Sequence, residues 1–253
     1  LNVNRLPVRQ PEIGRRLSII MPVRDGQRYI RTALESVACQ CADADELIVI
    51  DDASTDQTVE IVKAFSAPCR VHLLKGAGKG PAAARNLGLA RATGRLITFL
   101  DHDDYWPKKR IQSHLDCLEA QPSVDIAMGR VEYFLSPDSA RQNETRMLSE
   151  AVYGVNLGAS TFRREVFENV GLFDERMRFS EDHDLFLRIR EAGCQILPID
   201  DIGLYYRIHD TNMTRGKSPQ EMQFFEAIHK SLSRRRAQRQ ALSAFPKNRI
   251  RDA

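Results

Sequence analysis

The 253-residue sequence contains no apolar run of about 18 residues, the length that a membrane-spanning helix needs. Residues 1–14 lack the apolar core of a signal peptide. An initiator Met is also missing, which leaves open whether the N-terminus is complete. The sequence as printed therefore gives no sign of a spanning helix or a secretory leader.

Cysteine is sparse, and its placement excludes two kinds of structural site. The count is odd, and the spacing fits neither a zinc site nor a disulfide framework. The five residues are Cys39, Cys41, Cys69, Cys117 and Cys194. Reduced thiols of this kind are typical of proteins in the cytoplasm, which is the location that the sequence predicts.

The sequence also lacks a strong charge of either sign. It has 37 basic and 34 acidic side chains, a net charge of +3. Nucleic-acid-binding domains usually carry a larger basic excess, so we expect no nucleic-acid partner. Apolar residues make up 42% and charged residues 28%, which is ordinary for a globular protein with a sizeable core.

The first half of the chain alternates between two patterns. Short apolar runs predict buried strands at 17–23, 46–50, 71–74 and 95–100. Helical spacing separates them, with Ser54 or Thr55 as the expected cap of the second helix. Pro81 is expected at the start of the third helix and Gly94 at its end. Strands alternating with helices predict an α/β fold with a mainly parallel sheet and helices on both faces.

The second half is less regular. It predicts helices at 107–120 and 181–192, a strand at 124–134, a polar loop at 136–150 and strands at 195–200 and 202–208. We divide the chain into a polar leader (1–16), a main domain (17–215, with halves 17–106 and 107–215) and a basic helical extension (216–253).

The basic extension allows two interpretations. Phe225, Ile228 and Leu232 share one face of its expected helix, and Arg234, Arg235, Arg236 and Arg239 follow. Either this apolar face docks on the core, or it contacts a membrane surface. The second alternative would place the protein peripherally at the inner face of the membrane.

Polar clusters follow three of the expected strands. They are Arg24-Asp25, Asp51-Asp52 and Asp101-His102-Asp103-Asp104. Parallel strands present their carboxyl ends at one edge, where ligands bind. Asp101 and Asp103 point to one side of an extended segment, and their oxygens suit Mg²⁺ or Mn²⁺. The alternative is a strand-end turn with helix-capping aspartates.

The loop Gly76-Ala-Gly-Lys-Gly80 resembles a phosphate cradle at a helix N-terminus. It does not match the P-loop, in which Ser or Thr follows the lysine, because Gly80 follows Lys79 here. It does not match the dinucleotide-binding pattern either. Lys79 and, one turn further on, Arg85 could still place positive charge near a diphosphate.

The cluster Ser180-Glu181-Asp182-His183-Asp184 opens a helix. Acidic residues favour a first helical turn, so helix capping explains one or two of them. A carboxylate here could instead act as a general base toward a hydroxyl group.

Taken in order, these motifs resemble family 2 glycosyltransferases. The resemblance covers about residues 17–215. It rests on Pro22-Val-Arg-Asp-Gly26, Val49-Ile-Asp-Asp-Ala-Ser-Thr-Asp56, Ala84-Arg-Asn-Leu-Gly88, Phe99-Leu-Asp-His-Asp-Asp-Tyr-Trp-Pro107, Ser180-Glu-Asp182 and Tyr206-Arg-Ile-His-Asp-Thr-Asn212. It implies the GT-A fold, in which a nucleotide-binding α/β half merges with an acceptor-binding half.

The resemblance also implies roles for individual residues. Asp52 would contact the nucleotide base, Asp104 the donor sugar, and Asp182 would be the catalytic base, which must stay ionised. Asp101, Asp103 and His209 would hold the metal, although His209 could equally be a buried hydrogen-bonding residue. The other residues expected near the donor are Pro22, Val23, Arg24, Asp25, Lys79, Arg85, Asp101 and His102. The residues expected near the acceptor are Gly158, Ala159 and Glu181.

The implied reaction is inverting transfer of a sugar from a nucleoside-diphosphate donor, with Mn²⁺ or Mg²⁺ as cofactor. The acceptor would be a hydroxyl group on a saccharide, a lipid-linked molecule or another compound, as in polysaccharide, glycolipid or glycoconjugate synthesis. A UDP-sugar is the expected donor, but Arg24-Asp25 replaces the usual residues after the first strand and alters the base contact. A sugar-phosphate nucleotidyltransferase and a non-catalytic nucleotide-sugar-binding protein are the alternatives. Oligomeric state stays open.

Overall fold

A computed structural model describes residues 16–136, 146–148 and 150–238. The strands are β1 (Leu17–Val23), β2 (Asp45–Asp51), β3 (Arg70–Lys75), β4 (Leu96–Phe99), β5 (Ile126–Leu135), β6 (Arg146–Met147), β7 (Ser160–Arg163) and β8 (Ile196–Ile208). The helices are α1 (Ile30–Ala38), α2 (Thr58–Lys63), α3 (Pro81–Arg91), α4 (Arg110–Ala120), α5 (Arg164–Val170), α6 (Glu181–Glu191) and α7 (Phe224–Gln238). The expected leader 1–16 lies, apart from Arg16, outside the described residues, as does the chain beyond 238.

Within the described residues the strands form one mixed sheet, in the order β3-β2-β1-β4-β7-β5-β6, with β8 paired to β5. Strands β3, β2, β1 and β4 run parallel to one another. Strand β7 is antiparallel to both β4 and β5, and so joins the two halves of the chain. The predicted α/β fold with a mainly parallel sheet is confirmed in its first half, and its antiparallel elements lie in the second.

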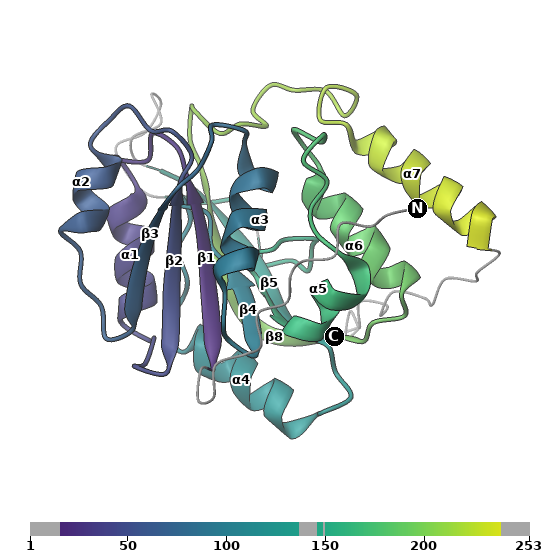
Figure 1. Cartoon of the computed structure of the whole chain (residues 1–253), viewed down its shortest axis with the longest axis horizontal. Coiled ribbons are helices and arrows are strands. Elements are labelled where there is room, and N and C mark those ends of the chain that lie inside the picture. The colour runs from purple at the N-terminus through teal and green to yellow at the C-terminus, as the bar shows by residue number, and fades with distance from the viewer. Residues whose placement is uncertain (1–15, 137–145, 149, 239–253) are drawn as a thin grey trace.

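Helices cover both faces of this sheet (Figure 1). Helices α1, α2 and α4 bury apolar side chains in one core cluster, and α3, α5 and α6 in the other. Residues of β1 alternate between them, with Ile19 and Met21 in the first cluster and Ile20 in the second. All seven residues of β1 and of β2 are buried, which explains their continuous apolar runs.

Helix α3 lies unusually close to the sheet. A methyl group on Gly88 would stand 2.5 Å from Ile20 Cγ2, so a glycine is required there. This approach fixes where the preceding turn of α3, with Arg85, lies over the ends of the strands.

Several local predictions are wrong. Neither Ser54 nor Thr55 caps α2; instead the Thr58 amide donates to Asp56 Oδ1 at 2.9 Å. Helix α3 begins at Pro81 as predicted but ends at Arg91, before Gly94. The two strands predicted at 195–208 are one strand, β8, with a register irregularity against β5. Part of the predicted 136–150 loop forms the two-residue strand β6, and residues 137–145 and 149 lie outside the described chain.

Of the two interpretations of the basic extension, docking of the apolar face on the core is not what the structure shows. Ala227 and Ser231, at 0% and 4% exposure, face the protein, whereas Phe225 and Leu232 are 54% and 42% exposed. Arg234 joins the docked side through Asp184 and Glu191 of α6. The most buried contacts are therefore small and ionic, Phe224 and Ile228 are half-buried, and Phe225 and Leu232 point away. No described helix is both long and apolar enough to cross a bilayer.

Candidate active site

Three polar segments meet at one edge of the sheet, as predicted. Because β1 pairs with β2 on one side and with β4 on the other, the residues that follow these strands become neighbours. A methyl group on Gly26 would lie 2.6 Å from the ring of His102, which shows how closely the first and third segments approach. Pro22 and Val23 are buried within β1, and the Arg24 side chain is 58% exposed.

The first two segments are tied together by Asp25. Its carboxylate Oδ1 accepts hydrogen bonds from the Thr55 amide (2.7 Å) and hydroxyl (3.1 Å), and its own amide donates to Ser54 Oγ (2.9 Å). Ser54 and Thr55 therefore hold this junction and do not cap a helix. The carboxylate has a structural partner, and donor contact by Asp25 stays a prediction.

Asp52 organises the glycine-rich loop. Its carboxylate accepts from the backbone amides of Gly78 (2.7 Å), Lys79 (3.2 Å) and Gly80 (2.7 Å). The loop can wrap the side chain because Gly78 and Gly80 have positive φ angles of 69° and 95°. The amides that resembled a phosphate cradle thus bind a carboxylate of the protein itself, and Lys79 is held beside Asp52.

Arg85 connects the two halves of the chain. Its Nη2 donates to Asp101 Oδ1 at 2.7 Å and its Nη1 to Glu181 Oε1 at 2.5 Å. The Arg85 side chain is only 6% exposed and the Glu181 side chain 8%. Burial alone would lower the pKa of Arg85, but the charges of Asp101 and Glu181 outweigh it and raise that pKa. Glu181, predicted to contact the acceptor, has its carboxylate bound inside the protein, and burial raises its pKa.

Asp103 and His209 form a second pair, 106 positions apart in the chain. His209 Nε2 lies 3.0 Å from Asp103 Oδ2, and His209 Nδ1 lies 2.9 Å from Thr211 Oγ1. The ring of Tyr29 lies beside the imidazole, with 4.6 Å between the ring centroids. Burial works to raise the pKa of Asp103, but the hydrogen bond from His209 and the charges of His102 and His209 together outweigh it and the pKa is lowered.

Asp104 lies deeper than its neighbours. It is 3% exposed, and its Oδ1 accepts from the Arg207 amide at 2.8 Å. Burial, together with the charges of Asp103 and Asp101, raises the pKa of this carboxyl group well above its usual value. Its predicted contact with the donor sugar stays a prediction.

Arg207 is a site residue to which sequence reasoning gave no role. Its Nε donates to the Asp103 carbonyl oxygen at 2.7 Å, and its guanidinium lies 4.7 Å from the Tyr29 ring centroid and 4.9 Å from that of Phe134. Its place in the Tyr206–Asn212 motif, two residues before His209, was the available signal.

Among the described residues, no group of three or more His, Cys, Asp or Glu side chains is arranged to hold a metal ion. Asp103 and His209 converge, whereas Asp101 is directed to Arg85. Two side chains suit Mg²⁺ or Mn²⁺ when the remaining ligands come from substrate phosphates and water. The arrangement fits a metal bound jointly with a diphosphate better than a closed protein cage.

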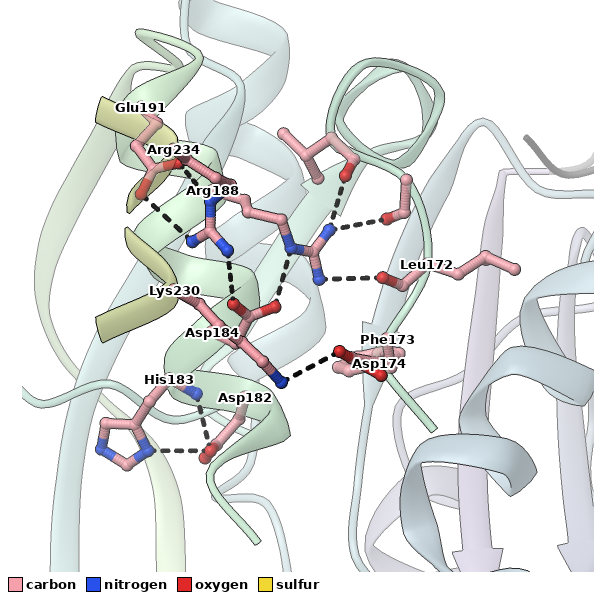
Figure 2. Close-up of polar contacts among 12 residues, drawn as sticks. Leu172, Phe173, Asp174, Asp182, His183, Asp184, Arg188, Glu191, Lys230 and Arg234 are labelled. Carbon is pink, nitrogen blue, oxygen red and sulfur yellow. Dashed lines mark hydrogen bonds and ion pairs between the residues drawn. The ribbon is translucent and has the colours of Figure 1, made fainter. Parts of the chain in front are cut away.

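Asp182 lies at the start of α6, next to the Arg85 pair. Its Oδ1 accepts from the amide (2.7 Å) and from Nδ1 (2.9 Å) of His183 (Figure 2). Its side chain is 29% exposed. Burial works to raise its pKa, but the hydrogen bond and charge of His183 and the charge of Arg85 lower it. An ionised carboxylate is what a general base needs, as expected.

The residues predicted near the acceptor lie inside the fold. The Gly158 carbonyl accepts from Trp106 Nε1 at 2.8 Å and from Arg110 Nη2 at 3.1 Å. Ala159 is fully buried, and its carbonyl accepts from the Gly129 amide at 2.9 Å. Their contact with an acceptor stays a prediction.

Residues 18–181 match the model of a family described as "Glycosyl transferase family 2". The chain belongs to this family. As a family 2 glycosyltransferase it is an enzyme, and its sheet and helices are those of the GT-A fold. The family match ends at Glu181, immediately before Asp182.

Two relatives of this glycosyltransferase have names that state a process or a reaction. The minor teichoic acid biosynthesis protein GgaA of Bacillus subtilis is 32% identical over 70% of this chain and 44% of its own. WfaP of Escherichia coli, named as a UDP-Glc:α-D-GlcNAc-diphosphoundecaprenol β-1,3-glucosyltransferase, is 27% identical over 79% of this chain and 80% of its own. The chain thus spans less than half of one relative and most of the other.

Solved structures share the fold at low sequence identity. Staphylococcus aureus TarS (residues 1–349), in complex with UDP-GlcNAc, has a TM-score of 0.70, is 23% identical and is matched over 86% of this chain and 66% of its own. A mannosyltransferase of Pyrobaculum calidifontis, in complex with GDP-Man and Mn²⁺, has a TM-score of 0.64, is 20% identical and is matched over 96% of this chain and 68% of its own.

Proposed function

We propose that this glycosyltransferase moves a sugar, with inversion at the anomeric carbon, from a nucleoside-diphosphate donor to an acceptor hydroxyl group. The observation that carries the proposal is that Asp52, Asp101 and the Asp103–His209 pair lie at the edge where β1, β2 and β4 end, and that Arg85 links this edge to the start of α6, where Asp182 lies. This edge is where open α/β sheets bind their ligands.

The donor would lie over the ends of β1, β2 and β4. Asp52 and the loop that it holds would contact the base, and the exposed guanidinium of Arg24 would offer a planar surface for stacking. A UDP-sugar is the first candidate, because TarS binds UDP-GlcNAc and WfaP is named for UDP-Glc. Lys79 adds positive charge on the same loop.

Asp103 and His209 would hold Mn²⁺ or Mg²⁺ together with the diphosphate, and Asp101 would contact the same ion or the ribose. When bound there, the ion neutralises charge that develops on the departing diphosphate. The solved mannosyltransferase complex contains Mn²⁺.

Asp182 would take the proton from the acceptor hydroxyl group as its oxygen attacks the anomeric carbon. The lowered pKa keeps this carboxylate ionised at neutral pH. Arg85, fixed between Asp101 and Glu181, keeps the donor edge and the start of α6 in register. Donor turnover by the wild type and by Asp182→Asn, described at the end of the Discussion, tests this assignment.

We also propose that α7 places the enzyme at the anionic inner face of the cytoplasmic membrane, where it would meet a lipid-linked acceptor. Phe225 and Leu232 are exposed on the side of α7 away from its docked side, and Ile228 beside them is half-buried. The exposed Arg236 and the half-buried Arg235 add positive charge near this face, and the sequence has no Asp or Glu from Ala227 to Arg251. Apolar and basic side chains on one helix face suit anionic lipid. WfaP is named for a lipid-linked acceptor.

A further inference from the structure

The carboxylate of the proposed base is held by the residue that follows it. Both hydrogen bonds from His183, from its amide and from Nδ1, end on Asp182 Oδ1 (Figure 2). An aspartate carboxylate otherwise rotates broadly about its terminal torsion. With Oδ1 bound on one side, Oδ2 becomes the oxygen that can face an acceptor.

The imidazole of His183 is in turn held by α7. The ring of Phe224, the first residue of α7, meets it edge-on, with centroids 5.2 Å apart and an interplanar angle of 89°. His183 therefore has Asp182 on its Nδ1 side and a phenyl ring against its plane. Its side chain is 37% exposed, so this packing rather than deep burial limits its rotation.

The chain that enters α7 also clamps the segment before Asp182. Gln223 Oε1 accepts from the amides of Arg178 (2.7 Å) and Phe179 (3.1 Å), and Ser180 Oγ donates to the Met222 carbonyl at 2.8 Å. Ser180 is in the left-handed region, with φ +56°. These contacts oppose the backbone relaxation that a strained non-glycine residue would favour.

Ion pairs fix α7 along the rest of its length (Figure 2). Lys230 Nζ lies 3.1 Å from Asp174 Oδ2, and Arg234 reaches Asp184 Oδ1 at 2.9 Å and Glu191 Oε2 at 2.6 Å. Asp184 is shared with Arg188 of α6 at 2.9 Å. The position of Phe224 against His183 is therefore set by three ion pairs of α7, two with α6 and one with Asp174 in the segment before it.

We propose that His183 is a positioning residue for the catalytic base and that α7 completes this part of the active site by holding the His183 ring. This inference rests on the proposed role of Asp182. It extends the catalytic unit beyond the family match, which ends at Glu181, into a helix more than forty residues further along the chain.

The proposal predicts that kcat depends on pH. The charged groups that face the His183 ring are Asp182 and Glu181 of its own helix, whereas α7 presents Phe224. The hydrogen bond to Asp182 raises the pKa of His183. Protonated His183 binds Oδ1 more strongly and makes Asp182 a weaker base, so kcat should rise as the pH rises through the His183 pKa.

Three variants test separately the hydrogen bond from His183 to Asp182, the presence of a ring at position 183 and the support of that ring by Phe224. His183→Phe keeps a ring against Phe224 but removes the donor. His183→Asn keeps a donor near the position of Nδ1 but cannot titrate. Phe224→Ala keeps His183 but removes its support. Nucleotide binding, measured as the shift in melting temperature with UDP and Mn²⁺, shows whether each variant is folded.

We expect His183→Phe to lower kcat by about 10-fold to 100-fold, the usual effect of removing a hydrogen bond that orients a catalytic group, with donor KM little changed. His183→Asn should keep kcat within about 3-fold of the wild type and lose the rise with pH. Phe224→Ala should also lower kcat, but by less than His183→Phe does.

Wild-type kcat and an unchanged pH profile in His183→Phe would overturn the inference while Asp182→Asn stayed inactive. An equal loss of kcat in His183→Phe and His183→Asn would also overturn the inference, because the hydrogen-bond donor retained in His183→Asn would then have no effect. If Asp182→Asn itself keeps wild-type turnover, the proposed base is wrong, and the positioning role falls with it.

Discussion

Arg85 Nη1 lies 2.5 Å from Glu181 Oε1, which joins two residues 96 positions apart. The second arm of the same guanidinium holds Asp101 at the end of β4. One buried cation thus links the expected donor edge to the helix that carries the expected base. Removing this guanidinium should lower the stability of the protein as well as its activity.

Arg85→Met should destabilise the protein by about 3 kcal/mol or more, because it leaves the buried Glu181 carboxylate without its partner. The measurement is the free energy of unfolding in urea. The double variant Arg85→Met with Glu181→Gln removes the buried charge and should recover part of the loss. A single variant as stable as the wild type would show that the pair does not hold the two halves together.

His209→Ala should weaken metal-dependent nucleotide binding, because it leaves Asp103 as the remaining side chain of the converging pair. The expected result is a smaller rise in melting temperature with UDP and Mn²⁺, with the metal-free shift unchanged. Thr211→Val is the matched control, since Thr211 contacts the other ring nitrogen of His209. An unchanged manganese effect in His209→Ala would remove His209 from the proposed metal site.

The proposed contact between the outer face of α7 and a membrane can be tested with lipid vesicles. Phe225→Ser combined with Leu232→Ser should reduce co-sedimentation with phosphatidylglycerol vesicles by about 10-fold or more, since each large apolar side chain contributes roughly 1.5–3 kcal/mol when removed from water. Leu87→Ser, at an exposed leucine of α3, is the control and should bind as the wild type does. Equal binding by the double variant would contradict the membrane proposal and leave the transferase proposal intact.

His114 should make stability depend on pH. Burial and then the nearby charge of Arg110 hold its pKa well below the ordinary value. Below about pH 6.5 the unfolded chain therefore binds a proton that the folded chain does not, and stability falls by up to about 1.4 kcal/mol per pH unit. His114→Asn should flatten this dependence between pH 7.5 and pH 5.5 in urea unfolding. An identical slope in the variant would show that His114 is not the cause.

The sequence was sufficient for the elements that depend on local pattern. Strands β1 to β4, the start of α3 at Pro81 and the edge where three polar segments meet all follow from apolar runs and the geometry of parallel strands. The predicted cap by Ser54 or Thr55 failed because a distant residue, Asp25, binds both, Ser54 through its amide and Thr55 through its carboxylate.

Long-range pairing is the part that a sequence does not show. The antiparallel insertion of β7 between β4 and β5 depends on contacts between the two halves of the chain. The apolar row of α7 was expected either on the core or on a membrane, and the docked side depends instead on ion pairs from Arg234 and Lys230. Arg207 and the His183–Phe224 contact became visible only when distant segments were brought together.

The measurement that bears most directly on the account is donor turnover by the wild type and by Asp182→Asn, across nucleotide sugars with Mn²⁺. The account predicts that at least one donor, a UDP-sugar first, is turned over by the wild type. The variant should bind that donor with the same shift in melting temperature and lose turnover by at least about 100-fold. Equal turnover by Asp182→Asn, or no donor that binds or reacts, would contradict the account.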